Sequence, residues 1–155
     1  MIIQVTLIPT ISLNDPMKNQ FYVIVNRDES DKFRQFNYNT YEKLLEKLGY
    51  SNSRFWAFPE NEKEGFDKVK IDDEIYFAIQ GDHTFSFSAK VSGKEENSNL
   101  AEKVFGEGFR QKITKSVLFF NEFFVTSINY SEMLRSTGQE SVDKPGLYLI
   151  QNKFE

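Results

Sequence analysis

Six short apolar segments, rich in β-branched and aromatic residues, are the feature that most limits what this chain can fold into. They lie at residues 21–25, 54–58, 74–79, 84–91, 116–128 and 146–150. Runs of this length and composition, bounded by polar turns, predict β-strands. Helical patterns are fewer, and the predicted strands follow one another closely. This order predicts an α+β fold in which a mixed or antiparallel sheet curls into a small β-barrel with short flanking helices.

Two of these segments have a more specific pattern. In residues 84–91 every second side chain is apolar, which predicts a strand with one half-exposed face. The apolar positions are Phe85, Phe87, Ala89 and Val91. The segment 116–128 consists of two apolar runs around Asn121 and Glu122. It predicts either a hairpin or one long bulged strand.

The clearest helix pattern lies at residues 39–50. Asn39 is a candidate N-cap with Glu42 three residues later, and Gly49 is typical of a helix end. One apolar stripe is formed by Leu44, Leu45 and Leu48.

Two shorter helices are predicted further along the chain. One is capped within residues 97–99 and continues through Leu100, Val104 and Phe105. The other opens at Ser131 and closes at Gly138.

The composition excludes several kinds of chemistry. The 155 residues suit a single domain that spans residues 1–155. The chain has no cysteine, which excludes disulfides, thiolate metal sites and thiol catalysis, and its single histidine is too few for a zinc site. No P-loop motif, signal peptide or membrane-spanning stretch is present in the sequence. We therefore expect a cytoplasmic protein that has no membrane contact, binds no metal or cofactor, and is not an enzyme.

His83 is the residue on which an enzymatic function would depend. A catalytic group of His83 with nearby carboxylates is conceivable, but no nucleophile motif accompanies it. The surrounding residues 80–84 are typical of a hairpin turn between two strands. We interpret His83 as a turn residue.

The only tryptophan, Trp56, lies in a strand that carries rings on both faces. A lone tryptophan in a strand is more often a core residue than a ligand-binding one. Phe55 and Trp56 point to opposite faces, however, and we expect only one face to meet the core. The polar turn at 59–62, which includes Asn61, follows directly. An exposed ring beside hydrogen-bonding groups is what a base-stacking pocket needs, so the sequence predicts a partly exposed Trp56 there.

Basic residues gather in the second half of the chain, although the formal net charge is −4. Two interpretations are open: an ordinary mixed surface, which the nearby Glu102 and Glu107 favour, or a phosphate-facing rim on an otherwise acidic domain. The negative total argues against loose binding of a nucleic-acid backbone. The candidate phosphate-binding residues are Arg54, Lys90, Lys94, Arg110, Lys112 and Lys115.

The order of these motifs resembles the EVE and YTH branch of the PUA-like superfamily. It is most similar to the EVE-like domains at the N-terminus of McrB-type restriction proteins. The stretches that match are FYVIVNRDE, RFWAFPENE, VKIDDEIYFAI, TFSFSAKVSG, LAEKVFGEGF and SVLFFNEFFVTSI, within residues 21–138. Two departures are that the usual Gly-Asp turn is Asp72-Asp73 here, and that residues 1–20 lie outside the pattern.

The resemblance implies a β-barrel that holds a flipped, modified base in a pocket lined by aromatic rings. Trp56 matches the ring that follows the first helix in the YTH pattern. The polar turn that meets the base edge in such relatives corresponds to Asn26, Arg27 and Asp28. Further rings would come from the loop that carries Phe105 and Phe109.

The function that this resemblance implies is the recognition of a methylated base in double-stranded DNA for a McrBC-type restriction system. The chain would be the N-terminal specificity module of a larger protein that also contains a GTP-driven AAA+ motor, and a separate subunit would be the nuclease. Any GTPase or nuclease activity would lie in those other parts. Two alternatives stay open: a PUA-like RNA-binding module, and a barrel that binds a small ligand or peptide. Whether the base is 6-methyladenine or a methylcytosine is also open.

Overall fold

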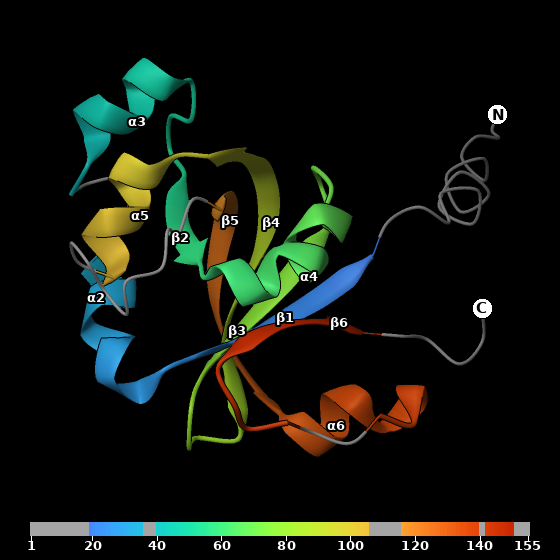
Figure 1. Cartoon of the computed structure of the whole chain (residues 1–155). Helices are drawn as coiled ribbons and strands as arrows, with labels where there is room; N and C mark the ends of the chain where they lie inside the picture. Colours follow the sequence, from blue (N-terminus) through green and yellow to red (C-terminus); the bar gives the residue numbers. More distant parts are fainter. Residues whose placement is uncertain (1–18, 36–39, 106–115, 140–141, 151–155) are drawn as a thin grey trace, which may run out of the picture.

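The computed structural model describes residues 19–35, 40–105, 116–139 and 142–150. Within these ranges the chain forms one six-stranded sheet with the strand order β2-β5-β4-β3-β1-β6. The strands are β1 (Gln20–Val25), β2 (Arg54–Phe58), β3 (Glu74–Ile79), β4 (Thr84–Glu96), β5 (Ser116–Asn129) and β6 (Gly146–Ile150). β1 and β3 are parallel, and the other neighbouring strands are antiparallel. The sheet curls into a half-barrel, which confirms the predicted mixed sheet and α+β class (Figure 1).

Short helices connect and flank the strands (Figure 1). The α-helices are α2 (Ser30–Gln35), α3 (Glu42–Leu48), α4 (Lys63–Lys68), α5 (Ser98–Phe105) and α6 (Tyr130–Leu134). The 3-10 helices are η1 (Arg27–Glu29), η2 (Glu60–Glu62) and η4 (Arg135–Thr137). The segments of η1 and η2 were predicted as polar turns, and no helix was predicted at α2 or α4.

Some of the helix ends follow local sequence chemistry. Gly49 ends α3 with a φ of 90°, as predicted. The Oδ1 of Asn97 accepts a hydrogen bond of 3.1 Å from the Leu100 N–H, which confirms the predicted cap of α5. Two predicted starts are wrong. The N-cap of α3 is Tyr41 rather than Asn39, which lies outside the described residues, and α6 is opened by Asn129 rather than Ser131.

The segment after Ser116 is one long bulged strand and not a hairpin. β5 continues unbroken through Asn129, and its register with β4 shifts at three places. At the junction of the two apolar runs, Glu122 has a φ of 50°. The bulges also overturn the predicted alternation of β4, because Phe85 packs on the opposite face of the sheet from Ala89 and Val91.

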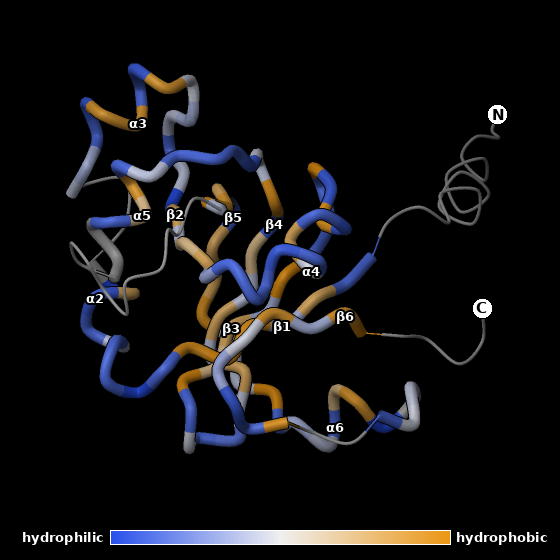
Figure 2. The backbone as a smooth tube through the Cα atoms, in the orientation of Figure 1, coloured by the Kyte–Doolittle hydropathy of each residue, from blue (hydrophilic) through white to orange (hydrophobic). Residues whose placement is uncertain are grey.

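Apolar side chains fill both sides of the central strands. Phe21, Val23 and Val25 of β1 belong to the main core. Tyr22 and Ile24 point the other way into a second cluster, which α6 covers. Figure 2 shows the hydrophobic segments concentrated on the strands, while α2 and α4 are largely hydrophilic. Because both faces of the sheet are buried at β1, nearly all side chains of this strand are apolar.

Candidate aromatic site and basic residues

Trp56 is buried, contrary to the prediction of an exposed ring. Its side chain is 4% exposed, and Phe55 on the opposite face of β2 is fully buried. The ring of Phe55 meets those of Tyr41 and Phe119, with centroids 5.5 and 6.4 Å away, and α5 packs against β2. The assumption that one face of this strand would lack a cover was wrong, since Phe33 of α2 covers the Trp56 face and Tyr41 covers the Phe55 face.

The ring of Phe33, from α2, contacts Trp56 in the main core. The two centroids are 5.2 Å apart with the rings at 81°, an edge-to-face arrangement. The same Phe33 ring meets four phenylalanines from β3, β4 and β5 at centroid distances between 5.0 and 6.4 Å. We call Phe33 and its five ring neighbours the ring cluster. Its members are Phe33, Trp56, Phe77, Phe87, Phe120 and Phe123.

Arg54 lies against this ring cluster. Its guanidinium carbon is 3.8 Å from the centroid of the Phe123 ring. Arg54 stands two residues before Trp56, so both side chains leave the same face of β2. Burial lowers the pKa of Arg54, which still remains a cation because the ordinary value is so high. A stacked guanidinium beside aromatic rings can hold a phosphate or stack on a base.

The predicted base-edge residues lie where β1 ends. The Oδ1 of Asn26 accepts a hydrogen bond of 2.8 Å from the Asp28 N–H and so opens η1. The Nε of Arg27 donates to the Gln80 carbonyl at 2.8 Å, and its Nη2 forms an ion pair with Asp82. These contacts attach η1 to the β3–β4 turn, at the carboxyl ends of the two parallel strands. Asp28 is exposed there.

The remaining predicted pocket residues are not brought to the ring cluster by any contact that the structure describes. Asn61 is exposed in η2, which follows β2. Phe105 is the last residue of α5, and Phe109 lies outside the described residues.

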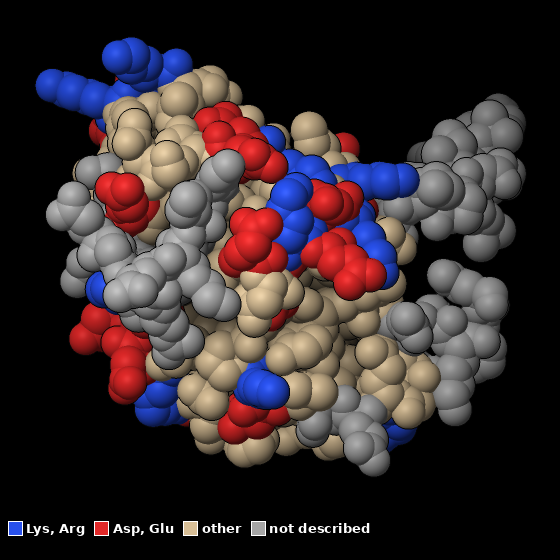
Figure 3. Space-filling model, in the orientation of Figure 1, with Lys and Arg blue, Asp and Glu red and all other residues tan. Residues whose placement is uncertain are grey.

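Three of the candidate phosphate-binding residues lie within the described ranges, and each has different surroundings. Lys94 donates from Nζ to the Phe66 and Asp67 carbonyls at 2.8 and 3.2 Å, so it satisfies the end of α4. Lys90 lies on the outer face of the sheet, and Arg54 lies on the ring cluster. Figure 3 shows positive and negative side chains interspersed on the face that it displays. Arg110, Lys112 and Lys115 lie outside the described residues, so the predicted rim stays a prediction.

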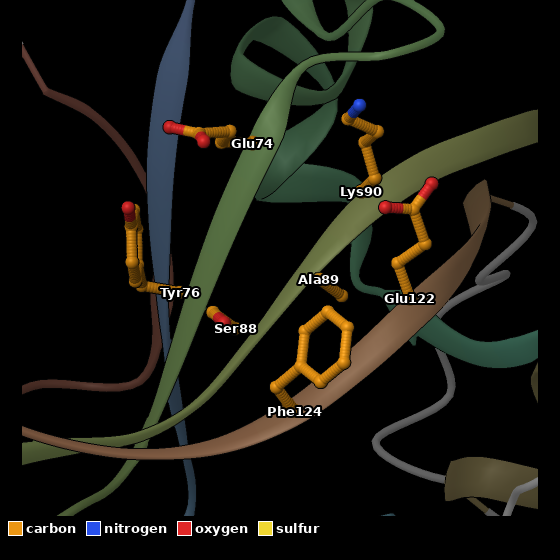
Figure 4. Close-up of a pocket in the computed structure, with 7 residues that line it drawn as sticks. All are labelled: Glu74, Tyr76, Ser88, Ala89, Lys90, Glu122 and Phe124. Atoms are coloured by element: carbon orange, nitrogen blue, oxygen red, sulfur yellow. The ribbon is translucent and has the colours of Figure 1, made fainter.

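A shallow hollow of about 110 Å³ lies on the outer face of β3, β4 and β5 (Figure 4). Lys90 shares it with two carboxylates and two rings. The lining residues are Glu74, Tyr76, Ser88, Ala89, Lys90, Glu122 and Phe124. Burial and the neighbouring Glu74 raise the pKa of Tyr76. Phe124 is 61% exposed and the adjacent Val125 is 81% exposed. The apolar Phe124, two residues after Glu122, is the sequence signal that could have indicated this hollow.

His83 lies in the β3–β4 turn, as predicted, with a φ of 56°. Its Nε2 is 3.7 Å from Oδ2 of Asp143. Asp143 also accepts hydrogen bonds from the Gly81 N–H at 3.0 Å and from the Tyr130 hydroxyl at 3.3 Å. The carboxylate therefore attaches the segment before β6 to this turn, which is a structural role.

Within the described ranges, no three His, Asp or Glu side chains come together as a metal site would require. None of the helices in those ranges is long and apolar enough to cross a membrane. Comparison with protein-family models and with curated proteins finds no match for this chain.

Proposed function

We propose that the chain is a nucleic-acid-binding specificity module of the EVE/YTH type within the PUA-like superfamily. Its ligand is a methylated base in double-stranded DNA, which flips out of the helix to meet aromatic rings. The curled mixed sheet with short helices is compatible with this fold. The order of the sequence motifs is the second support.

One observation carries the proposal: the Arg54 guanidinium lies 3.8 Å from the Phe123 ring, at the edge of the ring cluster that contains Trp56. Aromatic rings stack on any base, and a cation at their edge attracts the phosphate that accompanies a flipped nucleotide. Each stacked base contributes about 1–3 kcal/mol to binding. A buried methyl group adds about 0.8 kcal/mol. Flipping costs a few kcal/mol, so we expect modest affinity with selectivity for the methylated base.

In the wider system, the module would direct a GTP-driven AAA+ motor in the same cytoplasmic protein and a separate nuclease subunit to methylated DNA. This part of the proposal rests on the resemblance to McrB-type proteins alone. The module itself would perform no catalysis and would need no cofactor.

The test is a set of binding titrations with matched duplexes that contain 6-methyladenine, 5-methylcytosine or no modification, and with the corresponding RNA. We expect one methylated duplex to bind more tightly than its plain counterpart. Arg54→Ala should weaken that binding by about 1–3 kcal/mol, the range for contacts to a flipped or single-stranded base. The exposed Lys43 on α3 supplies the control, and Lys43→Ala should bind like the unchanged protein. Equal binding to methylated and plain duplexes would contradict the proposal, and a preference for RNA would favour the PUA-like alternative.

The outer hollow supports a second candidate function, the binding of a small ligand. Glu74, Glu122 and Lys90 line this hollow together with the exposed Phe124, so a small ligand with both polar and apolar parts would fit. Phe124→Ala should abolish such binding without any effect on DNA binding. The same substitution thus separates the two candidates.

A further inference from the structure

The ring of Phe33 occupies the centre of the ring cluster, although α2 is otherwise a polar surface helix. Phe33 is 2% exposed, whereas Asp31, Lys32 and Arg34 are exposed. Among the α2 residues whose burial is described, Phe33 is the only buried one. A helix of six residues has little stability of its own, so its position depends on tertiary contacts such as this ring.

The segment just before α2 has contacts of its own with the sheet. Arg27 holds η1 to the β3–β4 turn through the Gln80 carbonyl and Asp82. Gly81 lies so close to this guanidinium that an added Cβ would approach Arg27 Nε to 3.3 Å. The connection between Glu29 and Ser30 therefore joins an anchored turn to a helix in which Phe33 is the one buried side chain among those whose burial is described.

The neighbours of Phe33 form an aromatic box around it. Trp56 meets it edge-on, and Phe120 is nearly parallel to it, with 19° between the planes. Phe77, Phe87 and Phe123 complete the surroundings, and the Arg54 guanidinium covers Phe123. A planar, apolar ring surrounded by ring faces and edges, with a cation at the margin, is the environment that a stacked methylated base requires.

We infer that the Phe33 ring occupies the base-binding site in the free domain, and that the methylated base replaces it when α2 moves outward from the Glu29–Ser30 connection. This inference rests on the proposed function. It assigns Phe77, Phe87, Phe120 and Phe123, together with Trp56, to the base-binding site. It also makes Phe33 a competitor for that site. Only molecules whose Phe33 ring has left the site can bind the base, so the apparent affinity for DNA is the intrinsic affinity multiplied by the fraction of such molecules.

The test compares Phe33→Ala with Phe85→Ala. Both remove a buried phenylalanine, but Phe85 belongs to the second cluster on the other face of the sheet. Trp56, as the only tryptophan, reports binding by its fluorescence in every variant. We expect Phe33→Ala to bind the preferred methylated duplex about 10- to 100-fold more tightly, the factor that corresponds to the burial of one aromatic ring. Phe85→Ala should bind like the unchanged protein, when both are corrected for the folded fraction measured by urea unfolding.

Phe33→Leu provides a second variant if Phe33→Ala does not fold. Its smaller side chain should compete less well than phenylalanine and raise the affinity by a few-fold. If the unchanged protein prefers methylated DNA but neither Phe33 variant binds it more tightly, the inference is wrong and the proposed function stands. If the unchanged protein shows no preference for methylated DNA, the proposed function fails, and this inference fails with it.

Discussion

The two aromatic clusters of this domain, on opposite faces of one sheet, are held together in different ways. The second cluster contains Tyr22, Phe85 and Tyr130, and its tyrosine hydroxyls bond to fixed groups. The Tyr130 hydroxyl donates to Asp143, and the Tyr22 hydroxyl bonds to the Val142 backbone. The ring cluster around Phe33 contains only phenylalanines and Trp56.

This difference matters because a hydrogen bond has a direction and a dispersion contact between rings does not. A buried tyrosine that leaves its place abandons a hydrogen-bond partner, which costs about 1–3 kcal/mol when that partner stays buried. A phenylalanine that leaves can be replaced by another planar ring with little penalty. The second cluster is therefore suited to fixing α6 and the segment before β6. The ring cluster is suited to exchanging one ring for another.

The largest expected effect is on stability. Trp56→Ala and Phe85→Ala should each lower the free energy of unfolding by about 3–5 kcal/mol, since both rings are buried and each substitution leaves a cavity. Phe33→Ala should cost about 1.5–3 kcal/mol, the burial term alone, because α2 can settle differently once its ring is gone. Urea unfolding followed by circular dichroism measures all three. A loss for Phe33→Ala as large as that for Phe85→Ala would mean that α2 is as firmly fixed as α6.

A smaller effect is expected from one hydroxyl of the second cluster. Tyr130→Phe removes the hydrogen bond to Asp143 and keeps the ring, so it should cost about 0.5–1.5 kcal/mol. Asp143→Asn keeps an acceptor for Tyr130 and should cost less. If Tyr130→Phe is as stable as the unchanged protein, hydrogen bonds of the tyrosine hydroxyls do not distinguish the second cluster from the ring cluster.

The smallest expected effect appears only at high pH. Burial raises the pKa of Tyr148 from its ordinary value of 10.0 to about 12, and burial also raises the pKa of Tyr22. Because the folded state keeps these protons longer than the unfolded state, stability is complete below about pH 10 and falls as the pH rises toward 12. Urea unfolding at pH 8, 10 and 11 should show this fall, and Tyr148→Phe should reduce it. Phe33→Leu, on the other face, should leave the pH dependence unchanged.

Much of the fold followed from local patterns. The six strand positions, the end of α3 at Gly49 and the cap of α5 at Asn97 were all predictable, because each depends on neighbouring residues only. α2 was missed for the same reason: its one apolar anchor, Phe33, gives no helical stripe. Of the candidate site, the sequence patterns indicated Trp56 and Arg54 but not their partner Phe33.

The sequence by itself determined which segments are strands, since alternation and composition act within a few residues. Only the tertiary structure decided what covers each face of those strands. Trp56 is buried because α2, which follows β1 in the sequence, places Phe33 against it. On the other side of β2, Tyr41 packs on Phe55, and α5 also packs against this strand. Lys94 donates a hydrogen bond to the Phe66 carbonyl because the end of α4 lies within reach of its side chain. Burial and pairing of this kind depend on contacts between segments that are distant along the chain, and these arise only when the sheet curls.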